Sequence, residues 1–490
     1  MLFNSLDFVV FFILTVVSIP LLKQRKFQHI FLLVVSYIFF YYSSNYLIIL
    51  LIASTLLDFY LGKEIFKTTN KSKKKIFLSA SIISNLVLLG FFKYADFAIL
   101  QFNILGNYIN LATNIPLLNL VLPIGISFYT FQTLSYTIDI YREKLEPSKS
   151  LREFALFVSF FPQLVAGPIV RAKDFLPQLR EKISEMEINI KLKKIVIDEK
   201  NLKIGISLMS IGFVKKMLFA DNIASIPNDI FSQTLTSSSL EIWLGTIAFG
   251  IQIYGDFSGY SDIAIGAALI LGFKIPINFN KPYFAISPSD FWRRWHISLS
   301  SWLRDYLYIP LGGNKKSKSR TYLNLGIVML LGGLWHGASW NFVIWGGLHG
   351  AYLAIHRFIS DRFPKVSEFW FFKNRIGKLV TIIIMQYLVF LAWIPFRVSG
   401  IEEIKYSMYR YVFWQFDFSS LIEIVLKHKI PSVLIILFLV VNIISYKNPN
   451  YIERFVNLRN SLWTAVLIVI SLSILFLMDQ NQSQFIYFRF

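Results

Sequence analysis

The sequence predicts an all-α polytopic membrane protein, and three observations support this fold class. Hydrophobic residues make up 55% of the 490 residues and charged residues only 16%, which is far more apolar than a soluble globular domain. The apolar residues gather in long runs that match the roughly 20 helical residues needed to cross a bilayer core of about 30 Å. The period-two alternation that indicates half-buried strands is absent, so we expect the spans to be helical.

The apolar runs predict on the order of eleven spans. They lie at 8–22, 30–42, 46–61, 76–92, 154–169, 204–218, 322–334, 342–355, 379–394, 431–444 and 462–478. Lys23, Arg25 and Lys26 follow the first run, and a lysine-rich stretch at 63–75 follows the third. Basic loops favour the cytoplasm, so the N-terminus is expected outside. The first run has no basic residue before it and no small-residue cleavage site after it, so we interpret it as a retained span.

Charge and cysteine content exclude several classes of protein. The formal net charge of +20 is spread over many loops, which indicates membrane topology and contact with anionic lipid. A nucleic-acid partner is not expected, because no clustered, soluble basic domain is visible. The chain has no cysteine, which excludes thiol catalysis and thiolate metal sites, and it has no His-Glu-x-x-His motif, so no metal site is predicted.

Three polar stretches interrupt the apolar pattern. Residues 122–142 combine Pro123 and Gly125 with many hydroxyl and amide side chains, which predicts irregular backbone along a wet cavity. Residues 171–203 mix both charge signs and predict an interfacial loop with a short amphipathic helix. Residues 253–313 form the third stretch, in which charged side chains are most densely placed among aromatic and aliphatic residues.

Charges inside this third stretch must pair or face water, because a charge at the centre of a span costs about 2.5–3.5 kcal/mol. Within it, residues 288–311 predict a re-entrant or in-plane element. On one continuous helix, Trp292 and His296 would share an apolar face. We expect the polar side chains here and Trp335, in the later span, to support a channel; the candidates are Asp256, Asp290, Arg294, Asp305 and Trp335.

The six histidines differ in what their positions indicate. His336 lies beside Gly337 in an otherwise apolar span, and its spacing leaves a core role and a chemical role equally open. His349 lies thirteen residues further on, so one helix would not aim both imidazoles at one point; it is interpreted as a hydrogen-bonded helix–helix contact. His296 belongs to the third polar stretch, and the other three, His29, His356 and His428, adjoin basic residues at loop ends and are interpreted as structural or interfacial.

Four segments together resemble the membrane-bound O-acyltransferase superfamily, and in particular its bacterial alginate O-acetyltransferase-like branch. They are FFPQLVAGPIVR (160–171), YGDFSGYSDIAIGAALILGF (254–273), FWRRWHISLSSWLRDYLYIPLGGN (291–314) and LWHGASWNFVIWGGLHG (334–350). The resemblance implies a helical bundle around a channel, with a recognisable core at about 120–360 in a single domain of residues 1–478. It also implies that His336, in its Trp-His-Gly context, is essential and that His296 accompanies it.

Acyl transfer from a thioester to a hydroxyl needs a base and a donor to the oxyanion. A neutral imidazole suits the first need, so His336 is the expected base. His296 would orient the acceptor or donate to the oxyanion. Acetyl-CoA is the donor that the resemblance implies, with no permanently bound cofactor. Its phosphates would meet the basic cluster Lys315, Lys316, Lys318 and Arg320, for which a purely topological role is the alternative.

The last twelve residues, 479–490, consist of a polar linker and the hexapeptide FIYFRF. An interfacial aromatic anchor is one interpretation. The hexapeptide also resembles a terminal motif of envelope acylation systems, in which the tyrosine carries the acyl group; here that residue is Tyr487. A phenolate leaves more readily than an alkoxide, so a tyrosine ester is an activated carrier.

The expected function is transfer of an acetyl group across the cytoplasmic membrane to an envelope polysaccharide, either an alginate-like exopolysaccharide or peptidoglycan. A periplasmic or cell-surface SGNH-hydrolase-like acetyltransferase would complete the transfer. The alternatives are acyl transfer of the teichoic-acid D-alanylation type, a polytopic transporter or channel, and a scaffold for polymer export.

Overall fold

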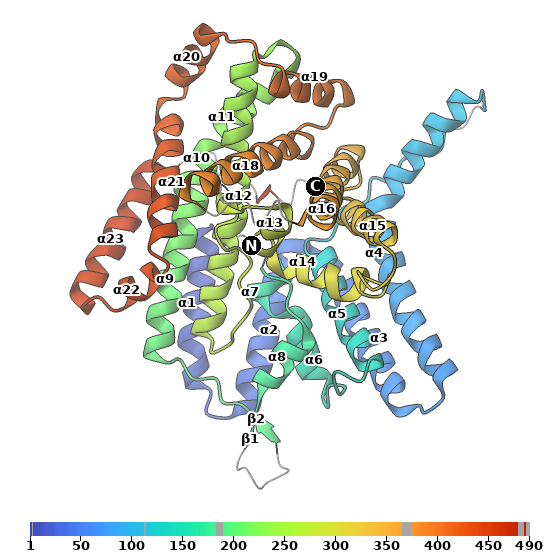
Figure 1. The fold of residues 1–490 in the computed structure, drawn as a ribbon. Coiled ribbons are helices and arrows are strands. Elements are labelled where there is room, and N and C mark those ends of the chain that lie inside the picture. The colour runs from blue at the N-terminus through green and yellow to red at the C-terminus, as the bar shows by residue number, and fades with distance from the viewer. Residues whose placement is uncertain are drawn as a thin grey trace. The chain divides into compact units, whose positions relative to one another are not determined.

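The computed structural model describes residues 1, 3–111, 114–165, 167–182, 190–364, 374–478 and 485–486. The chain divides into two compact units, and helices dominate both (Figure 1). The first unit comprises Met1–Ile206 and Ile263–Pro276, and the second comprises Ser207–Asp262 and Ile277–Phe490. Two helices, α9 (Glu199–Phe213) and α12 (Ser239–Ile270), contribute residues to both units.

The first unit contains eight further α-helices, two 3₁₀ turns and two short strands among the described residues. They are α1 (Leu6–Leu21), α2 (Arg25–Ser44), η1 (Asn45–Leu47), α3 (Ile48–Lys67), α4 (Lys71–Tyr108), α5 (Ile126–Tyr141), α6 (Leu151–Ser159), α7 (Phe161–Leu164), α8 (Ala172–Phe175), η2 (Leu176–Leu179), β1 (Arg180–Lys182) and β2 (Ile190–Leu192). The strands pair antiparallel, with Glu181 opposite Lys191. Both strands lie in the segment 171–203, predicted as an interfacial loop with a short helix, which also contains α8.

The prediction of irregular backbone at 122–142 was also wrong, because α5 is a regular helix. Gly125 precedes it with a φ of 80°, a conformation that glycine adopts without steric cost. The polar side chains of α5 are buried, and some of them join a hydrogen-bond network with neighbouring helices. Thr133 donates to Asn85 at 3.2 Å, and Asn85 donates to Asp58 at 2.8 Å. The network satisfies groups that would be costly to bury alone.

The candidate span at 154–169 is not one continuous helix. Helix α6 ends at Ser159, and α7 runs for only four residues. Phe160 has a ψ of 108°, outside the helical region, and Pro162 has no N–H with which to continue a helix. Most of the other apolar runs do lie within helices.

Five helical segments among the described residues are long and apolar enough to cross a membrane. They are Arg25–Lys67, Lys71–Tyr108, Arg375–Arg397, Lys429–Lys447 and Asn460–Leu477. Leu6–Leu21 is a shorter apolar helix. These helices agree with a multi-pass helical membrane protein.

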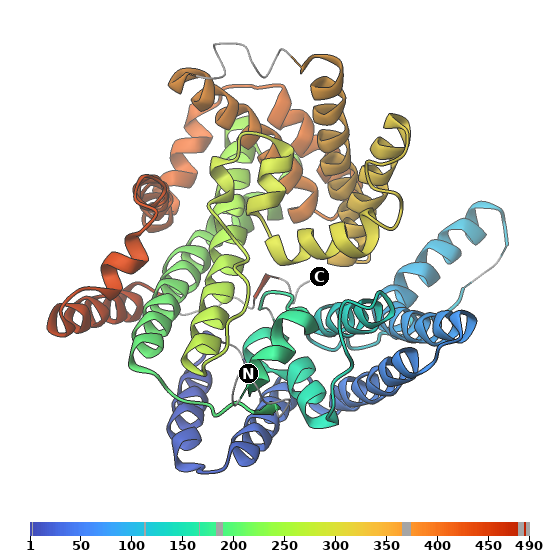
Figure 2. The ribbon, with the colours of Figure 1, turned by 60° about the horizontal axis from the view of Figure 1, so that its bottom comes forward.

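The second unit is built around a core of tryptophan and other large side chains. Its further elements are η3 (Val214–Ala220), α10 (Asp221–Ile223), α11 (Ser225–Ser232), η4 (Thr234–Thr236), η5 (Pro282–Phe284), α13 (Pro288–Arg294), α14 (Ile297–Leu303), η6 (Arg304–Tyr308), α15 (Lys318–His336), α16 (Trp340–Arg362), α18 (Arg375–Arg397), α19 (Ile401–Val412), α20 (Phe418–Lys427), α21 (Lys429–Lys447), α22 (Tyr451–Val456) and α23 (Asn460–Leu477). Trp295, Trp345 and Trp393 are almost fully buried in this core. The views in Figures 1 and 2 show α15 and α16 side by side.

Candidate active site

Two short helices flank His296, and the helical backbone is interrupted between them. Helix α13 ends at Arg294, α14 begins at Ile297, and His296 between them has a φ of 44°. The left-handed conformation is uncommon for a residue with a side chain, and such positions cluster at functional sites. The expectation that Trp292 and His296 share a face of one helix was wrong, because the break separates them.

His296 is held by the side chain of Asn278. The Nδ1 of His296 lies 3.1 Å from the Oδ1 of Asn278, which also accepts from the hydroxyl of Ser298 at 2.9 Å. The amide nitrogen of Asn278 donates to the hydroxyl of Ser261 at 3.2 Å. The backbone N–H of Ser298 also donates to this Oδ1 at 3.3 Å. Because a backbone N–H can only donate, this bond fixes the orientation of the amide, and the Oδ1 faces the imidazole.

This bonding pattern determines the tautomer of His296. An amide oxygen accepts only, so Nδ1 carries the proton and Nε2 of the neutral ring carries a lone pair. His296 is fully buried and lies outside the candidate spans. Burial lowers its pKa to about 3, because the charged form loses its hydration. The ring therefore stays neutral and can accept a hydrogen bond at Nε2, whereas it has no second N–H to give to an oxyanion.

His336 is the last residue of α15, and close packing against α16 positions it. A Cβ at Gly333 would overlap the carbonyl oxygen of Phe342, and a Cβ at Gly346 would overlap the carbonyl oxygen of Met329. Glycine at these positions thus lets the two backbones approach each other. After His336, Gly337 ends the helix, and the ring of Phe342 occupies the space where a side chain at this position would lie.

The imidazole of His336 is 3% exposed and lies among aromatic rings. Its centroid is 5.1 Å from that of Trp335, 5.0 Å from that of Trp345 and 5.4 Å from that of Phe396. The centroid of His296 lies 6.3 Å away. The structure thus brings together the two histidines that the sequence singled out, in surroundings that exclude water.

His349 contacts the same aromatic cluster from α16. Its ring lies 4.9 Å from Trp345, 5.2 Å from Trp292 and 5.7 Å from Phe291. Neither ring nitrogen has a hydrogen-bond partner among the described residues. The predicted hydrogen-bonded contact was therefore wrong, and ring stacking takes its place. The chain reverses between α15 and α16, which is why His336 and His349 both reach Trp345.

The other histidines hold the structure together at its edges. His29 bonds the carbonyl oxygen of Lys193 at 2.9 Å, and His428 bonds Asp229 at 3.0 Å. Both contacts agree with the structural interpretation. Among the described residues, no group of three His, Cys, Asp or Glu side chains is placed to hold a metal ion.

The candidate supporting residues fall into three groups. Trp335 contacts His336 directly. Asp290 and Arg294 form an ion pair of 3.0 Å within α13, and Asp305 pairs with Arg304 at 2.7 Å; for these residues the geometry indicates a structural role. Asp256 belongs to a separate buried ionic cluster.

A pocket of about 440 Å³ opens in the second unit beside this cluster of rings. Its lining includes Trp292, Arg304 and Arg357, together with Asn314 and Thr321. Neither His296 nor His336 lines the pocket, but Trp292 contacts Trp345 at 5.8 Å, and Trp345 contacts His336. The basic cluster follows Asn314 in the sequence, with its three lysines exposed (Lys315, Lys316, Lys318) and Arg320 partly exposed.

The described part of the C-terminal hexapeptide is buried in the second unit. Phe485 is fully buried against Phe257 and Tyr260, and Ile486 is 5% exposed. Such burial disagrees with an anchor at the lipid interface. Tyr487 lies outside the described residues.

Sequence reasoning missed Asn278, Trp345 and the partner of Asp256. Asn278 lies eighteen residues before His296, so no local spacing pointed to their contact. Lys216 was visible as a lysine inside the apolar run at 204–218, where a charge needs a partner, and that signal was available.

A buried pair of imidazoles in a helical membrane protein has the chemistry of a base and an orienting group. Comparison with known proteins shows the family. The sequence pattern of MBOAT, the membrane-bound O-acyltransferase family, matches residues 141–394, more than half of the chain. The chain therefore belongs to this family and is an O-acyltransferase.

Individual relatives narrow the branch. Peptidoglycan O-acetyltransferase of Helicobacter pylori is 31% identical, with 96% of this chain and 92% of the relative aligned. The "Probable alginate O-acetylase AlgI" of Pseudomonas putida is 35% identical over 100% of both chains. Teichoic acid D-alanyltransferase of Bacillus subtilis is 29% identical and covers 55% of this chain and 67% of the relative. The chain is thus more similar to the acetyltransferases than to this D-alanyltransferase.

Proposed function

We propose that this protein takes an acetyl group from a cytoplasmic thioester and passes it across the membrane for O-acetylation of an envelope polysaccharide. The observation that carries the proposal is the buried pair of His296 and His336, with centroids 6.3 Å apart. The names of the full-length relatives, which refer to peptidoglycan and to alginate, support these two polymers as acceptors. The fold would be a bundle of about eleven spans with re-entrant helices around a channel.

The proposed step is acyl transfer with general base catalysis. The acceptor oxygen attacks the thioester carbonyl carbon while His336 takes the hydroxyl proton. The tetrahedral intermediate then collapses, the carbon–sulfur bond breaks, and the imidazolium returns the proton to the leaving thiolate. The products are an acetyl ester and free coenzyme A. The aromatic rings around His336 exclude the water that would otherwise hydrolyse the thioester.

His296 serves as the orienting group in this proposal. Its Nδ1–H is engaged by Asn278, so its Nε2 would accept a hydrogen bond from an N–H of His336 in the reacting complex. The other nitrogen of His336 then carries the lone pair that receives the proton. A base oriented by a third group is a recurrent arrangement in acyl-transfer enzymes. Of the two roles expected for His296, donation to the oxyanion is disfavoured by its tautomer.

Acetyl-CoA is the proposed donor. Arg304 and Arg357 in the pocket wall and the basic cluster around Asn314 supply cations for its phosphates. The thioester end would pass Trp292 and Trp345 to reach His336, so the rings must move to admit it. Such a movement would close the site around the bound donor before acyl transfer begins.

The proposed acceptor of the first transfer is Tyr487. Its acetyl ester would then be attacked by the serine of an SGNH-hydrolase-like acetyltransferase on the outer side of the cytoplasmic membrane. This partner would complete the modification of the polysaccharide.

Turnover of the thioester tests the function. Purified protein given acetyl-CoA and its acceptor is expected to release free coenzyme A, measured with a thiol reagent. The chain itself has no cysteine, so the protein adds no background signal. A transporter or a scaffold would release none. Turnover of a D-alanyl carrier-protein thioester, with acetyl-CoA left intact, would instead place the protein with the teichoic-acid enzymes.

Replacing Asn278 by alanine tests the orientation of His296. The Nδ1–H would lose its buried acceptor, and we expect acetyl transfer to fall about ten- to a hundredfold, since such a loss costs about 1–3 kcal/mol. Asn278→Asp keeps an acceptor and should restore much of the rate. Because its carboxylate stabilises imidazolium, the rate should also begin to fall at higher pH during acidification than in the parent. Equal rates and pH profiles for all three proteins would contradict the role.

A further inference from the structure

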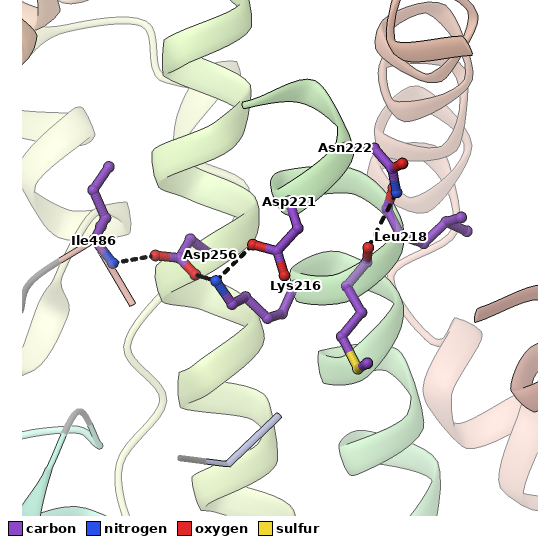
Figure 3. Close-up of polar contacts among 7 residues, drawn as sticks. Lys216, Leu218, Asp221, Asn222, Asp256 and Ile486 are labelled. Atoms are coloured by element: carbon purple, nitrogen blue, oxygen red, sulfur yellow. Dashed lines mark hydrogen bonds and ion pairs between the residues drawn. The ribbon is translucent and has the colours of Figure 1, made fainter. Parts of the chain in front are cut away.

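A buried ionic triad joins η3, α10 and α12 in the second unit. The ammonium of Lys216 is 2.7 Å from a carboxylate oxygen of Asp221 and 2.7 Å from the Oδ1 of Asp256. Figure 3 shows the ammonium between the two carboxylates. The side chain of Lys216 is fully buried, and both aspartates are 3% exposed. Lys216 lies in a π-helical turn, a distortion that is frequent at functional sites.

Stability alone does not explain the triad, because burying three charged groups costs hydration free energy. Buried ion pairs regain their lost hydration only with further hydrogen bonds, and apolar replacements are often as stable. Two carboxylates also share one ammonium, which leaves an excess of acceptor oxygens. A buried donor that satisfies one of those oxygens is therefore favoured.

The C-terminal segment supplies that donor. The backbone N–H of Ile486 donates to the Oδ2 of Asp256 at 2.7 Å, so the two carboxylate oxygens divide between the tail and Lys216 (Figure 3). Beside this bond, the ring of Phe485 packs 4.2 Å from that of Tyr260 and 5.8 Å from that of Phe257.

The docked segment is next to the candidate active site. Phe257, which contacts Phe485, also contacts the ring of His296 at 4.6 Å. Tyr487 follows Ile486 directly, and consecutive Cα atoms lie about 3.8 Å apart. A contact that fixes the backbone at Ile486 therefore bears on the residue that follows it in the chain.

We propose that Asp256, charged and oriented by Lys216 and Asp221, is a positioning residue that clamps the C-terminal segment and presents Tyr487 to the histidine pair. The aromatic slot of Phe257 and Tyr260 selects Phe485, and Asp256 fixes the register by binding the main chain. This inference rests on the proposed function, because it assigns the clamp to the acyl acceptor of that reaction.

The absence of cysteine in the chain permits a direct test of docking. Ile486→Cys places a single thiol at the clamp while keeping the backbone N–H. In the full-length protein in lipid nanodiscs, we expect a maleimide to modify this thiol slowly. Adding Asp256→Ala should speed modification about tenfold or more, since a hydrogen bond to a charged group is lost. Slow modification of the Ile486→Cys protein and fast modification of the double variant would support the clamp.

Asp262→Asn is the matched control. Asp262 lies on the same helix, α12, and its ion pair is with Lys215 of η3 at 2.6 Å rather than with the tail. Its variant should change neither the labelling rate nor the acetyl-transfer rate by more than about twofold, in line with a partly exposed pair. If Asp256→Ala does not fold, Phe485→Ala leaves the triad intact and should expose the same thiol.

The outcomes separate the clamp from the proposed function. Equal labelling of the Ile486→Cys protein with and without the Asp256→Ala change would overturn the clamp and leave the relay chemistry untouched. Faster labelling after Asp256→Ala together with an undiminished rate of acetyl transfer would show that the tail docks but does not serve the reaction. Faster labelling together with loss of acetylated Tyr487 in the mass spectrum, while Asp256→Glu restores part of it, is the result we expect.

Discussion

Replacing His336 by alanine is expected to lower acetyl transfer by about 10²–10⁴-fold, the usual contribution of a positioned general base. The side chain ends α15, and the closest backbone approaches between α15 and α16 lie at Gly333 and Gly346, so we expect the helix pair to stay assembled when the imidazole is removed. Release of coenzyme A from acetyl-CoA by the purified variant is the measurement. The loss should lie mainly in kcat, since the base acts in the transition state and not in binding the donor.

His356→Ala is the control for this prediction. His356 lies on α16 and is partly exposed, so its variant should keep the parent rate. A folded His336→Ala protein that releases coenzyme A at the parent rate would contradict the assignment of the base. An equal loss in His349→Ala would extend the site to the third histidine of the aromatic cluster.

Replacing Tyr487 by phenylalanine is expected to stop transfer of the acetyl group beyond the membrane protein. The change removes one oxygen and keeps the aromatic ring, so the tail should still dock through Phe485 and Ile486. Under turnover, intact-mass analysis of the parent should show one acetyl group on the C-terminal peptide, and the variant should show none. Release of coenzyme A should fall in parallel, because the first acceptor is gone.

Tyr409→Phe serves as the control for Tyr487→Phe. Tyr409 on α19 is exposed and has no place in the proposed reaction, so its variant should be acetylated at Tyr487 like the parent. Full polymer acetylation by the Tyr487→Phe protein would remove the relay and leave the direct acceptor as a hydroxyl of the partner or the polymer.

The fold class could be predicted from the sequence, because the apolar composition indicates helices buried in a membrane. His296 and His336 could also be predicted, because the motif around each residue is a continuous segment of the chain. The sequence was insufficient for the break at His296, where a left-handed residue interrupts what reads as one helix. It was also insufficient for Asn278 and for the contact of Ile486 with Asp256, which join positions far apart in the chain. Hydrogen bonds between residues far apart in the chain produce no periodic pattern in the sequence, so they cannot be predicted from residue spacing.

The helix at 126–141 shows a second reason for error. Its hydroxyl and amide side chains predicted a wet wall, but these side chains are buried, and Thr133 bonds Asn85, which bonds Asp58 on a neighbouring helix. Polar side chains in an apolar run indicate that partners exist without revealing whether the partners are water or protein.

The bond between Asp256 and the backbone of Ile486 has a consequence for inhibitor design. Because the clamp recognises main chain rather than a side chain at that position, a short aromatic peptidomimetic that carries a phenylalanine followed by a free amide N–H has the chemistry to compete for the slot. An N-methyl group on that amide would remove the donor while preserving the shape, and it would yield a matched inactive compound.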